Sequence, residues 1–546
     1  MSRIVGFILL SIIIIIGGGL WYWKTHKKKI IRSQLEKAVT EKSHGLYKVN
    51  YAGLELDEVA GNLSISSFKL SYDSARYLEL QQQNKEPFLL FSISIPQVLV
   101  TGVKTDRALL KKELSGRHLV LQNPVIEILY TNAGKDSSRN VPSKEIYQQI
   151  LSGLELIKLD TVIISGAEII TKSMKTGRIS VHFSNISINM LDVKVDSITK
   201  TDSSRLLFAK EFNIDCEKFT WESRNKFYKY EANSVVFRST SSLINIKEFY
   251  IKPLLNEDAF VRKFPVQTDR FDFAVRNIEL RNADFFRLTD EYIKADSLLI
   301  GSASLKIYRD RNRPPDTENK VGTYPHQLIQ RLPMQLDIKK AIVRNTNIEY
   351  KEKSSITHQV GKVQLWNSSA YITNITNRKE TIATSNIMVV DMQSRLLNKV
   401  PVSATWTMYL GNPDGKFRIK GKTGGGDVTL LNPLTIPMGP VELTSGHINS
   451  LEFYFTGTNY NMTGNLKLLY DDLHVALLKK EDDSVHFKKR KVTSLLANIK
   501  IKNKNPEKDE APRVAQINYK RNVQASIFNL AWKSLFTGVQ ETIGAK

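Results

Sequence analysis

The chain has 546 residues, 41% of them hydrophobic, which is enough for several ordinary domains or one elongated domain with a substantial core. Its net charge of +23 suggests nucleic-acid binding, but Lys and Arg are spread along the whole sequence instead of forming one dense block with interleaved aromatic residues. We therefore predict no nucleic-acid partner and interpret the charge as a solvated basic surface that favours anionic lipid headgroups.

The first predicted element is an apolar run, Ile4–Trp23, which contains no charged residue. As a helix this run would span ~30 Å, the thickness of the hydrocarbon core of a bilayer. Aromatic residues at its end and the lysines that follow are typical of a membrane interface. We predict a transmembrane anchor over residues 1–23, with side chains in the bilayer and its interface that include Ile4, Phe7, Ile12, Ile16, Trp21, Tyr22 and Trp23. A cleaved signal peptide is the alternative, although signal peptides usually have a shorter apolar core and an Ala-x-Ala-like exit.

A basic stalk helix is predicted over residues 24–44, because its apolar residues recur on one face and Gly45 can end it. From Leu46 onward the period becomes two, and β-branched and aromatic residues dominate short runs. We predict a mainly β fold: an elongated, twisted antiparallel sheet forming an open groove over 45–308 and 333–521. A Pro-rich loop and a short helix at 309–332 separate the two parts, and other helical patterns are few and short.

Seven strand-like runs share a break in the apolar alternation, so that an apolar residue recurs after five positions. Both ends of such a run face one side of a sheet only if a bulge or kink absorbs a residue. Ile164 and Phe183 are 19 residues apart and Leu280 and Ile300 are 20 apart, as expected for long hairpins with bent strands. The predicted helices are too few to cover the apolar face. We therefore interpret the ends of the runs as the groove lining, which comprises Ile65, Leu70, Leu121, Ile126, Ile164, Ile169, Phe183, Ile188, Leu280, Phe285, Ile300, Leu305, Val343 and Ile348.

The chain closes with a predicted amphipathic helix within residues 522–546. It either caps the end of the sheet or docks on a partner or a membrane. Its apolar face includes Val523, Ile527, Trp532, Leu535, Phe536 and Val539.

Patterns that carry chemistry are missing from the sequence. The nine histidines are scattered without the spacing of metal ligands, and no nucleophile has a neighbouring base. The segment Gly415–Thr423 comes nearest to a nucleotide-binding loop, but five residues separate its glycines where a Walker loop has four, and Phe417 and Ile419 alternate as in a strand. We predict a protein without enzymatic activity, catalytic residues, metal, nucleotide or cofactor.

The anchor, the basic helix and bent strands such as Gly61–Tyr72 resemble those of the AsmA-like family of envelope proteins. Ser445–Phe453 is also similar, and Met462–Tyr470 and Asn529–Gly538 resemble the C-terminal region of the family. The resemblance implies an inner-membrane protein whose large domain faces the periplasm, with an apolar β-groove suited to acyl chains. It also implies a link to outer-membrane lipid homeostasis, in the style of bridge-like lipid-transfer proteins.

Two hypotheses follow from these observations. In the first, the apolar groove holds or conducts the acyl chains of membrane phospholipids. In the second, the sheet packs into a closed scaffold whose terminal helix recruits an envelope protein partner. More Lys and Arg residues follow the apolar run than precede it. Taken literally, the positive-inside rule would then place the large domain in the cytoplasm.

Overall fold

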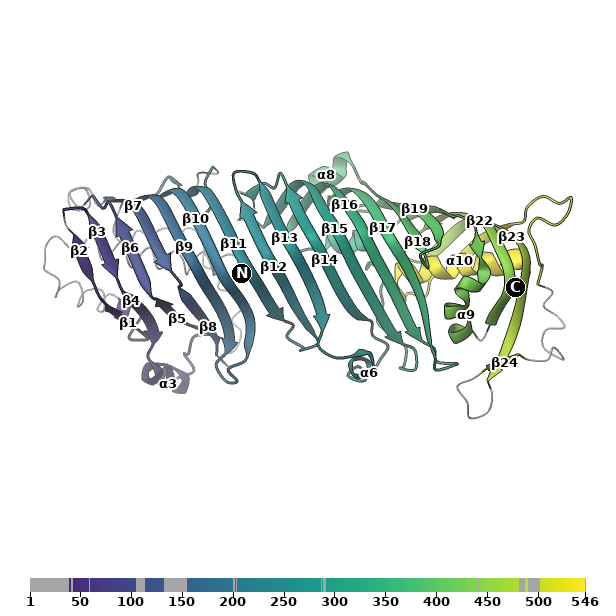
Figure 1. Ribbon diagram of the computed structural model, residues 1–546, viewed down its shortest axis with the longest axis horizontal. Helices are drawn as coiled ribbons and strands as arrows, with labels where there is room; N and C mark the ends of the chain where they lie inside the picture. Colours follow the sequence, from purple (N-terminus) through teal and green to yellow (C-terminus); the bar gives the residue numbers. More distant parts are fainter. Residues whose placement is uncertain are drawn as a thin grey trace. The chain divides into compact units, whose positions relative to one another are not determined.

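The computed structural model describes residues 39–40, 43–57, 59–104, 113–131, 155–199, 202, 204–285, 287, 291–439, 441–480, 487–489 and 501–545. These residues form long, twisted, mainly antiparallel strands with a few short helices, which confirms the predicted mainly β fold (Figure 1). They divide into unit 1 (up to Arg224, with Tyr230–Lys247) and unit 2 (Asn225–Lys229, with Glu248–Lys546). The predicted anchor and nearly all of the stalk helix lie outside the described residues. Within the described part of the chain, no helix is both long and apolar enough to cross a membrane.

Unit 1 consists of strands that are interrupted at one or two residues and then continue. Such breaks occur at Ser66, at Pro96 and at Asn123–Pro124. β3 pairs with β6 while β4, which follows the break, pairs with β5. The elements of unit 1 are β1 (Tyr47–Ala52), β2 (Glu55–Asp57), β3 (Asn62–Ile65), β4 (Ser67–Tyr72), α3 (Ser74–Gln82), β5 (Leu89–Ile95), β6 (Gln97–Thr101), β7 (Glu113–Gln122), β8 (Val125–Tyr130), β9 (Leu156–Ser173), β10 (Ile179–Val195) and β11 (Ala209–Glu222). β12 (Tyr228–Arg238) and β13 (Leu243–Pro253) contribute residues to both units.

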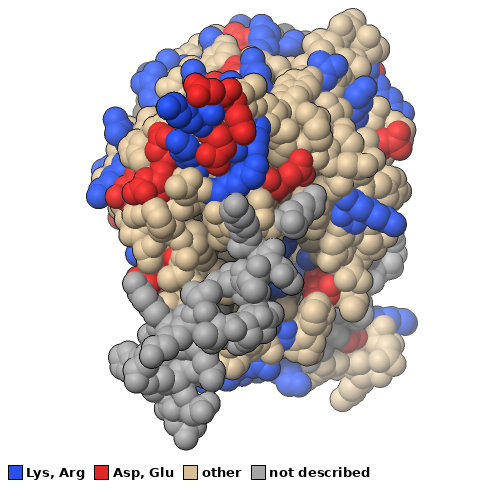
Figure 2. Space-filling model, turned by 90° about the vertical axis from the view of Figure 1, so that its right-hand side faces the viewer, with Lys and Arg blue, Asp and Glu red and all other residues tan. Residues whose placement is uncertain are grey.

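Unit 2 continues with long hairpins and ends in a helix. Its elements are α6 (Glu257–Val261), β14 (Arg270–Arg281), β15 (Tyr292–Asp310), α7 (Pro325–Gln330), β16 (Gln335–Lys353), β17 (Val360–Thr376), α8 (Lys379–Thr384), β18 (Ile387–Leu396), β19 (Val400–Tyr409), β20 (Phe417–Thr423), β21 (Gly426–Asp427), η4 (Val428–Leu431), α9 (Asn432–Met438), β22 (Val441–Gly457), β23 (Asn461–Lys480), β24 (Phe487–Lys489), β25 (Val514–Lys520) and α10 (Ile527–Ile543). On the face of the molecule drawn in Figure 2, basic side chains are scattered and several lie beside acidic ones.

Among the strand pairs that the structure describes, parallel pairing occurs in both units. β7 and β8 both pair in parallel with β9, and β15 pairs in parallel with β16. A parallel pair cannot be joined by a tight turn, because the chain must cross back to the starting edge. The predicted Pro-rich segment 309–332, with α7 near its end, provides the crossover from β15 to β16. This segment lies inside unit 2. The predicted β9–β10 and β14–β15 hairpins are both present.

Left-handed Asn or Gly residues mark five of the seven predicted breaks, namely Asn123, Gly166, Asn185, Asn282 and Asn345. These residue types tolerate positive φ best, because Gly lacks Cβ and Asn can bond locally. The strand register shifts beside Asn185 and Asn345, as predicted for bulges. Asn282 instead follows the last residue of β14, so that run ends a strand. A Cβ on Gly166 would lie 2.1 Å from Oδ1 of Asn123, which explains the glycine there.

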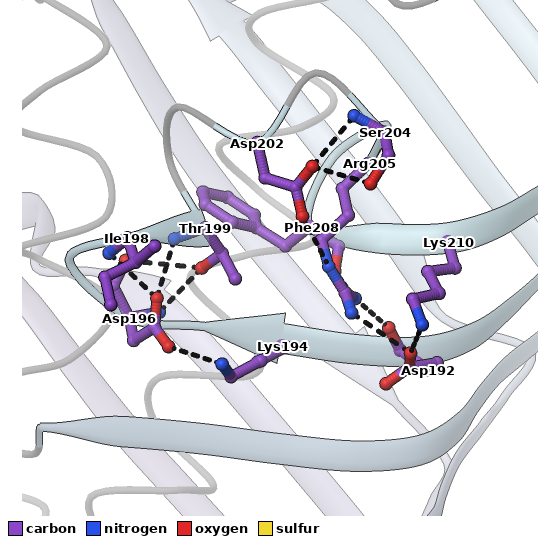
Figure 3. Close-up of polar contacts among 10 residues, drawn as sticks. All are labelled: Asp192, Lys194, Asp196, Ile198, Thr199, Asp202, Ser204, Arg205, Phe208 and Lys210. Atoms are coloured by element: carbon purple, nitrogen blue, oxygen red, sulfur yellow. Dashed lines mark hydrogen bonds and ion pairs between the residues drawn. The ribbon is translucent and has the colours of Figure 1, made fainter.

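A polar network orders the connection between β10 and β11 (Figure 3). Asp196 accepts hydrogen bonds from the amides of Ile198 (2.9 Å) and Thr199 (2.6 Å), and Lys194 Nζ lies 2.9 Å from its Oδ2. The nearly buried Arg205 side chain contacts carboxylates of Asp192 (3.0 Å) and Asp202 (3.3 Å). These contacts link the end of β10 to the turn that leads into β11.

Desolvation by itself would raise the pKa of the Asp196 carboxyl group. The backbone amide of Thr199, the Lys194 ammonium group, the Thr199 hydroxyl and the amide of Ile198 outweigh it and lower the pKa to about 2. The ionised carboxylate therefore stabilises this turn at neutral pH.

Candidate apolar groove

Two rows of apolar side chains cross unit 2 from β14 to β25, each formed by residues that are direct partners on neighbouring strands. Row 1 comprises Ile278, Ile300, Val343, Ala370, Met392, Ala404, Gly421, Phe453, Leu466 and Ala515. Row 2 comprises Leu280, Leu298, Ala341, Ile372, Val390, Trp406, Ile419, Phe455, Gly464 and Ile517. Because directly paired residues share a face of the sheet, the rows form one continuous apolar face.

The opposite face of the same strands is largely polar. The residues between the two rows, which point the other way, are Glu279, Leu299, Ile342, Tyr371, Asp391, Thr405, Lys420, Tyr454, Asn465 and Gln516. From β17 onward every member of this set carries a polar or charged group. One face of unit 2 therefore suits water and the other suits hydrocarbon.

α10 covers the apolar face only at the C-terminal end of the rows. Leu466 and Ala515 are 0% and 2% exposed, whereas every member of row 1 from Ile278 to Phe453 is partly exposed. Gly538 lets the helix approach closely, since a Cβ there would lie 3.0 Å from Cβ of Leu466. A side chain at this position would push α10 away from β23. The predicted terminal helix thus caps one end of the sheet, and α9 packs against β17 and β22. Row 1 stays partly exposed from Ile278 to Phe453, whereas Ala341, Ile419 and Phe455 of row 2 are buried.

A groove of about 750 Å³, within the size range of pockets for organic ligands, follows row 1 across the sheet, and its lining also includes the residues on either side of row 1 in each strand. β16 to β20 and β22 line it. Its row 1 lining includes the small residues Ala370, Ala404 and Gly421, together with Phe453. A Cβ on Gly421 would lie 2.4 Å from the Phe453 ring, so glycine is needed for the ring to pack over β20.

The row 1 part of the groove lining is suited to hydrocarbon, whereas the residues on either side of it include Arg344, Asp391, Lys420, Lys422 and Glu452. Its row 1 residues carry neither charge nor a hydrogen-bonding side chain. Nearby, the buried hydroxyls of Ser368 and Ser394 satisfy each other at 2.8 Å. Among the described residues, no group of three or more His, Cys, Asp or Glu side chains is placed to hold a metal ion. The arrangement can shield an apolar chain from water.

An aromatic stripe on α10 extends the apolar surface. Phe528, Trp532 and Phe536 are 66%, 51% and 44% exposed, and each follows the previous one by a single helical turn. The ring of Phe528 lies 6.1 Å from that of Trp406, a member of row 2. Ile527 is buried against the sheet.

The other predicted helix residues divide between the core and the loop before it. Leu535 and Val539 pack against the core. Val523 precedes α10, because the side chain of Ser526 accepts a hydrogen bond from the Asn529 amide and starts the helix there.

Five of the predicted lining residues lie in apolar rows of unit 2. Ile300 and Val343 belong to row 1, and Leu280 belongs to row 2. Leu305 and Ile348 belong to a third row, which contains Phe273, Leu305, Ile348, Leu365, Leu396 and Val400. Phe285 lies beyond the end of β14 and is only 2% exposed, so it belongs to the protein interior.

The predicted residues of unit 1 also fall into two cross-strand rows. Ile65, Val98, Leu121, Ile164, Ile188 and Ile214 form one row. Val49, Leu70, Ile93, Ile126, Ile169, Phe183 and Phe219 form the other. Most of these side chains are buried, with Leu121 0% and Ile126 1% exposed, so the candidate groove is confined to unit 2.

Sequence reasoning missed the residues of the groove floor, including Ala370, Met392, Ala404, Gly421 and Phe453. It searched for breaks in the apolar alternation, whereas these residues lie in plain alternating strands such as Val402–Trp406. The feature of the sequence that could have identified them is the apolar alternation of these strands, in which small residues stand in place of large ones. Comparison of the sequence with known protein families and with curated proteins finds no match to either.

Proposed function

We propose that this protein is a non-enzymatic, membrane-anchored protein that holds or conducts the acyl chains of phospholipids along the apolar face of unit 2. The observation that carries the proposal is the partial exposure of row 1 from Ile278 to Phe453. Exposed apolar surface costs ~25 cal/mol per Å², so a continuous face of this kind indicates an apolar occupant. Acyl chains fit because a row offers an extended apolar track without hydrogen-bonding groups.

The sequence resemblance to AsmA-like envelope proteins supports the same proposal. In that interpretation, Ile4–Trp23 anchors the chain in the inner membrane and the described units face the periplasm. The protein would then contribute to the lipid homeostasis of the outer membrane. The closed-scaffold alternative requires a covered apolar face, and the partial exposure of Ala370 and Ala404 does not favour it.

The test is lipid extraction from the purified full-length chain, followed by mass spectrometry. We expect stoichiometric phospholipid in the wild type and a large loss in the double variant Ala370→Asp/Ala404→Asp. Both substitutions place a carboxylate on the groove floor, where an acyl chain would have to desolvate it.

The matched control is Ser369→Asp/Ser403→Asp, which adds the same charges one residue away on the opposite face of β17 and β19, where both serines also line the groove but point away from row 1. The control should keep its lipid, and circular dichroism should show that both variants retain their strand content. A folded groove variant with wild-type lipid content would refute the lining assignment. A folded, lipid-free wild-type protein would favour the closed scaffold.

A further inference from the structure

The segment Gly415–Thr423, which lacks the glycine spacing of a nucleotide-binding loop, contains strand β20 in the structure. In β20, Phe417 and Ile419 are 0% and 2% exposed on the apolar face. The alternate residues point the other way and are all cationic and exposed, namely Lys416, Arg418, Lys420 and Lys422. We call these four residues the β20 cations. At ~6.8 Å per two strand residues they form a straight line about 20 Å long.

The neighbours of the β20 cations do not neutralise them. On β19 the paired residues are Ser403, Thr405 and Thr407, and Tyr409 lies beside Lys416. On β22 the paired residues are Glu452, Tyr454 and Thr456. Glu452 is the one carboxylate in this set, and it already binds Lys467 on β23 at 3.0 Å. Asp391, one strand further away, accepts a hydrogen bond from Thr405 at 2.7 Å.

Tyrosine rings are interleaved with the cations. Lys416 Nζ and Arg418 Cζ lie 5.2 and 5.5 Å from the centre of the Tyr409 ring. Tyr454, directly paired with Lys420, is 44% exposed. A line of cations beside the half-buried Tyr409 and the exposed Tyr454 is a combination suited to a membrane interface, where the ring sits among headgroups and the charges contact phosphate.

We propose that the β20 cations bind the anionic phospholipid headgroups of a membrane surface. The β20 cations lie on the face opposite to row 1, where the acyl chains are proposed to bind, and two of them, Lys420 and Lys422, also line the groove. The flat, linear arrangement matches an extended layer of phosphates better than one folded partner with a pocket. The charge complementarity rests on four exposed cations, of which only Lys422 has an acidic residue, Glu452, as a paired neighbour.

The experiment holds the full-length chain in phosphatidylcholine nanodiscs and measures binding to immobilised vesicles by surface plasmon resonance. Vesicles of phosphatidylcholine alone are compared with vesicles that also contain phosphatidylglycerol. We expect binding to the anionic vesicles that weakens with added salt. The variant Lys416→Gln/Arg418→Gln/Lys420→Gln/Lys422→Gln should bind at least about tenfold more weakly, since each cation near an anionic surface contributes measurably.

The control Arg276→Gln/Arg281→Gln/Arg287→Gln/Lys339→Gln removes four other exposed cations of unit 2, each ion-paired in the structure. It changes the net charge equally and should bind the anionic vesicles like the wild type. The proposal is overturned if the β20 variant still binds normally, or if both variants lose binding equally. Loss of heparin binding without loss of vesicle binding would likewise overturn it and assign the surface to another polyanion. The lipid content of each protein, measured separately, reports on acyl-chain binding along row 1.

Discussion

The two units carry the same sequence pattern but bury it differently. In unit 1 the row through Leu121 and Ile164 is almost fully buried, whereas in unit 2 row 1 is partly exposed from Ile278 to Phe453. The residues of unit 1 rows are mainly Ile, Leu and Val, but the middle of row 1 contains Ala370, Ala404 and Gly421. Apolar alternation thus identifies an apolar face, and side-chain size together with the covering elements decides whether that face is core or groove.

The largest expected difference between the units comes from truncating one leucine in each. Leu121→Ala in the buried row should cost about 3 kcal/mol of unfolding free energy, because it leaves a cavity. Leu305→Ala in the partly exposed third row should cost about 1 kcal/mol. Urea denaturation of both variants measures the difference. Equal losses would show that the two rows have the same environment in solution.

Acid should destabilise the two units in different pH ranges. Burial lowers the pKa of the His326 side chain in α7 to about 4, and the nearby backbone of Gly415 acts in the opposite direction. Neither ring nitrogen of His326 has a hydrogen-bond partner. The unfolded state then binds more protons than the folded state between pH 6.5 and 4. Unit 2 should therefore lose about 3 kcal/mol as the pH falls through that range.

Unit 1 should respond only to stronger acid. The pKa of Asp196 is lowered from 3.8 to about 2, so its stabilising contribution is complete above pH 3.8 and is lost as the pH falls toward 2. The loss should be about 2 kcal/mol. Pulsed hydrogen exchange after incubation at each pH, read at peptide level, separates the units. His326→Leu should remove the response of unit 2 between pH 6.5 and 4, whereas Asp196→Asn should weaken the response of unit 1 to stronger acid, where the carboxyl groups of Asp73, Asp192 and Asp202 also have lowered pKa values. Simultaneous loss in both units would indicate one cooperative structure.

The smallest expected effects are at the left-handed breaks and should be alike in the two units. Asn185→Val and Asn345→Val should each cost about 1–2 kcal/mol, because a β-branched side chain is strained at positive φ. Asn→Gly at either position should stay within a few tenths of a kcal/mol, since glycine favours the same conformation. Thermal unfolding of the four variants tests this. A valine variant as stable as its glycine counterpart would show that the break does not require the left-handed residue.

Local sequence determined the strands, their breaks and the terminal helix. Period-two alternation requires strands with one apolar face, Asn and Gly permit the kinks, and Ser526 starts α10. These properties depend on neighbouring residues, so they can be inferred from sequence.

Only the tertiary structure decided which apolar residues are accessible. Leu121 and Val343 occupy equivalent places in their sequence patterns, yet the first is 0% exposed and the second is partly exposed. The difference arises from strand pairing and from covering elements such as α10, which bring together residues far apart in the chain. The same applies to the parallel pairing of β15 with β16 and to the isolation of the β20 cations, because both depend on which strands become neighbours. Periodicity specifies the face of a residue, whereas burial and charge neutralisation depend on what the folded chain places against it.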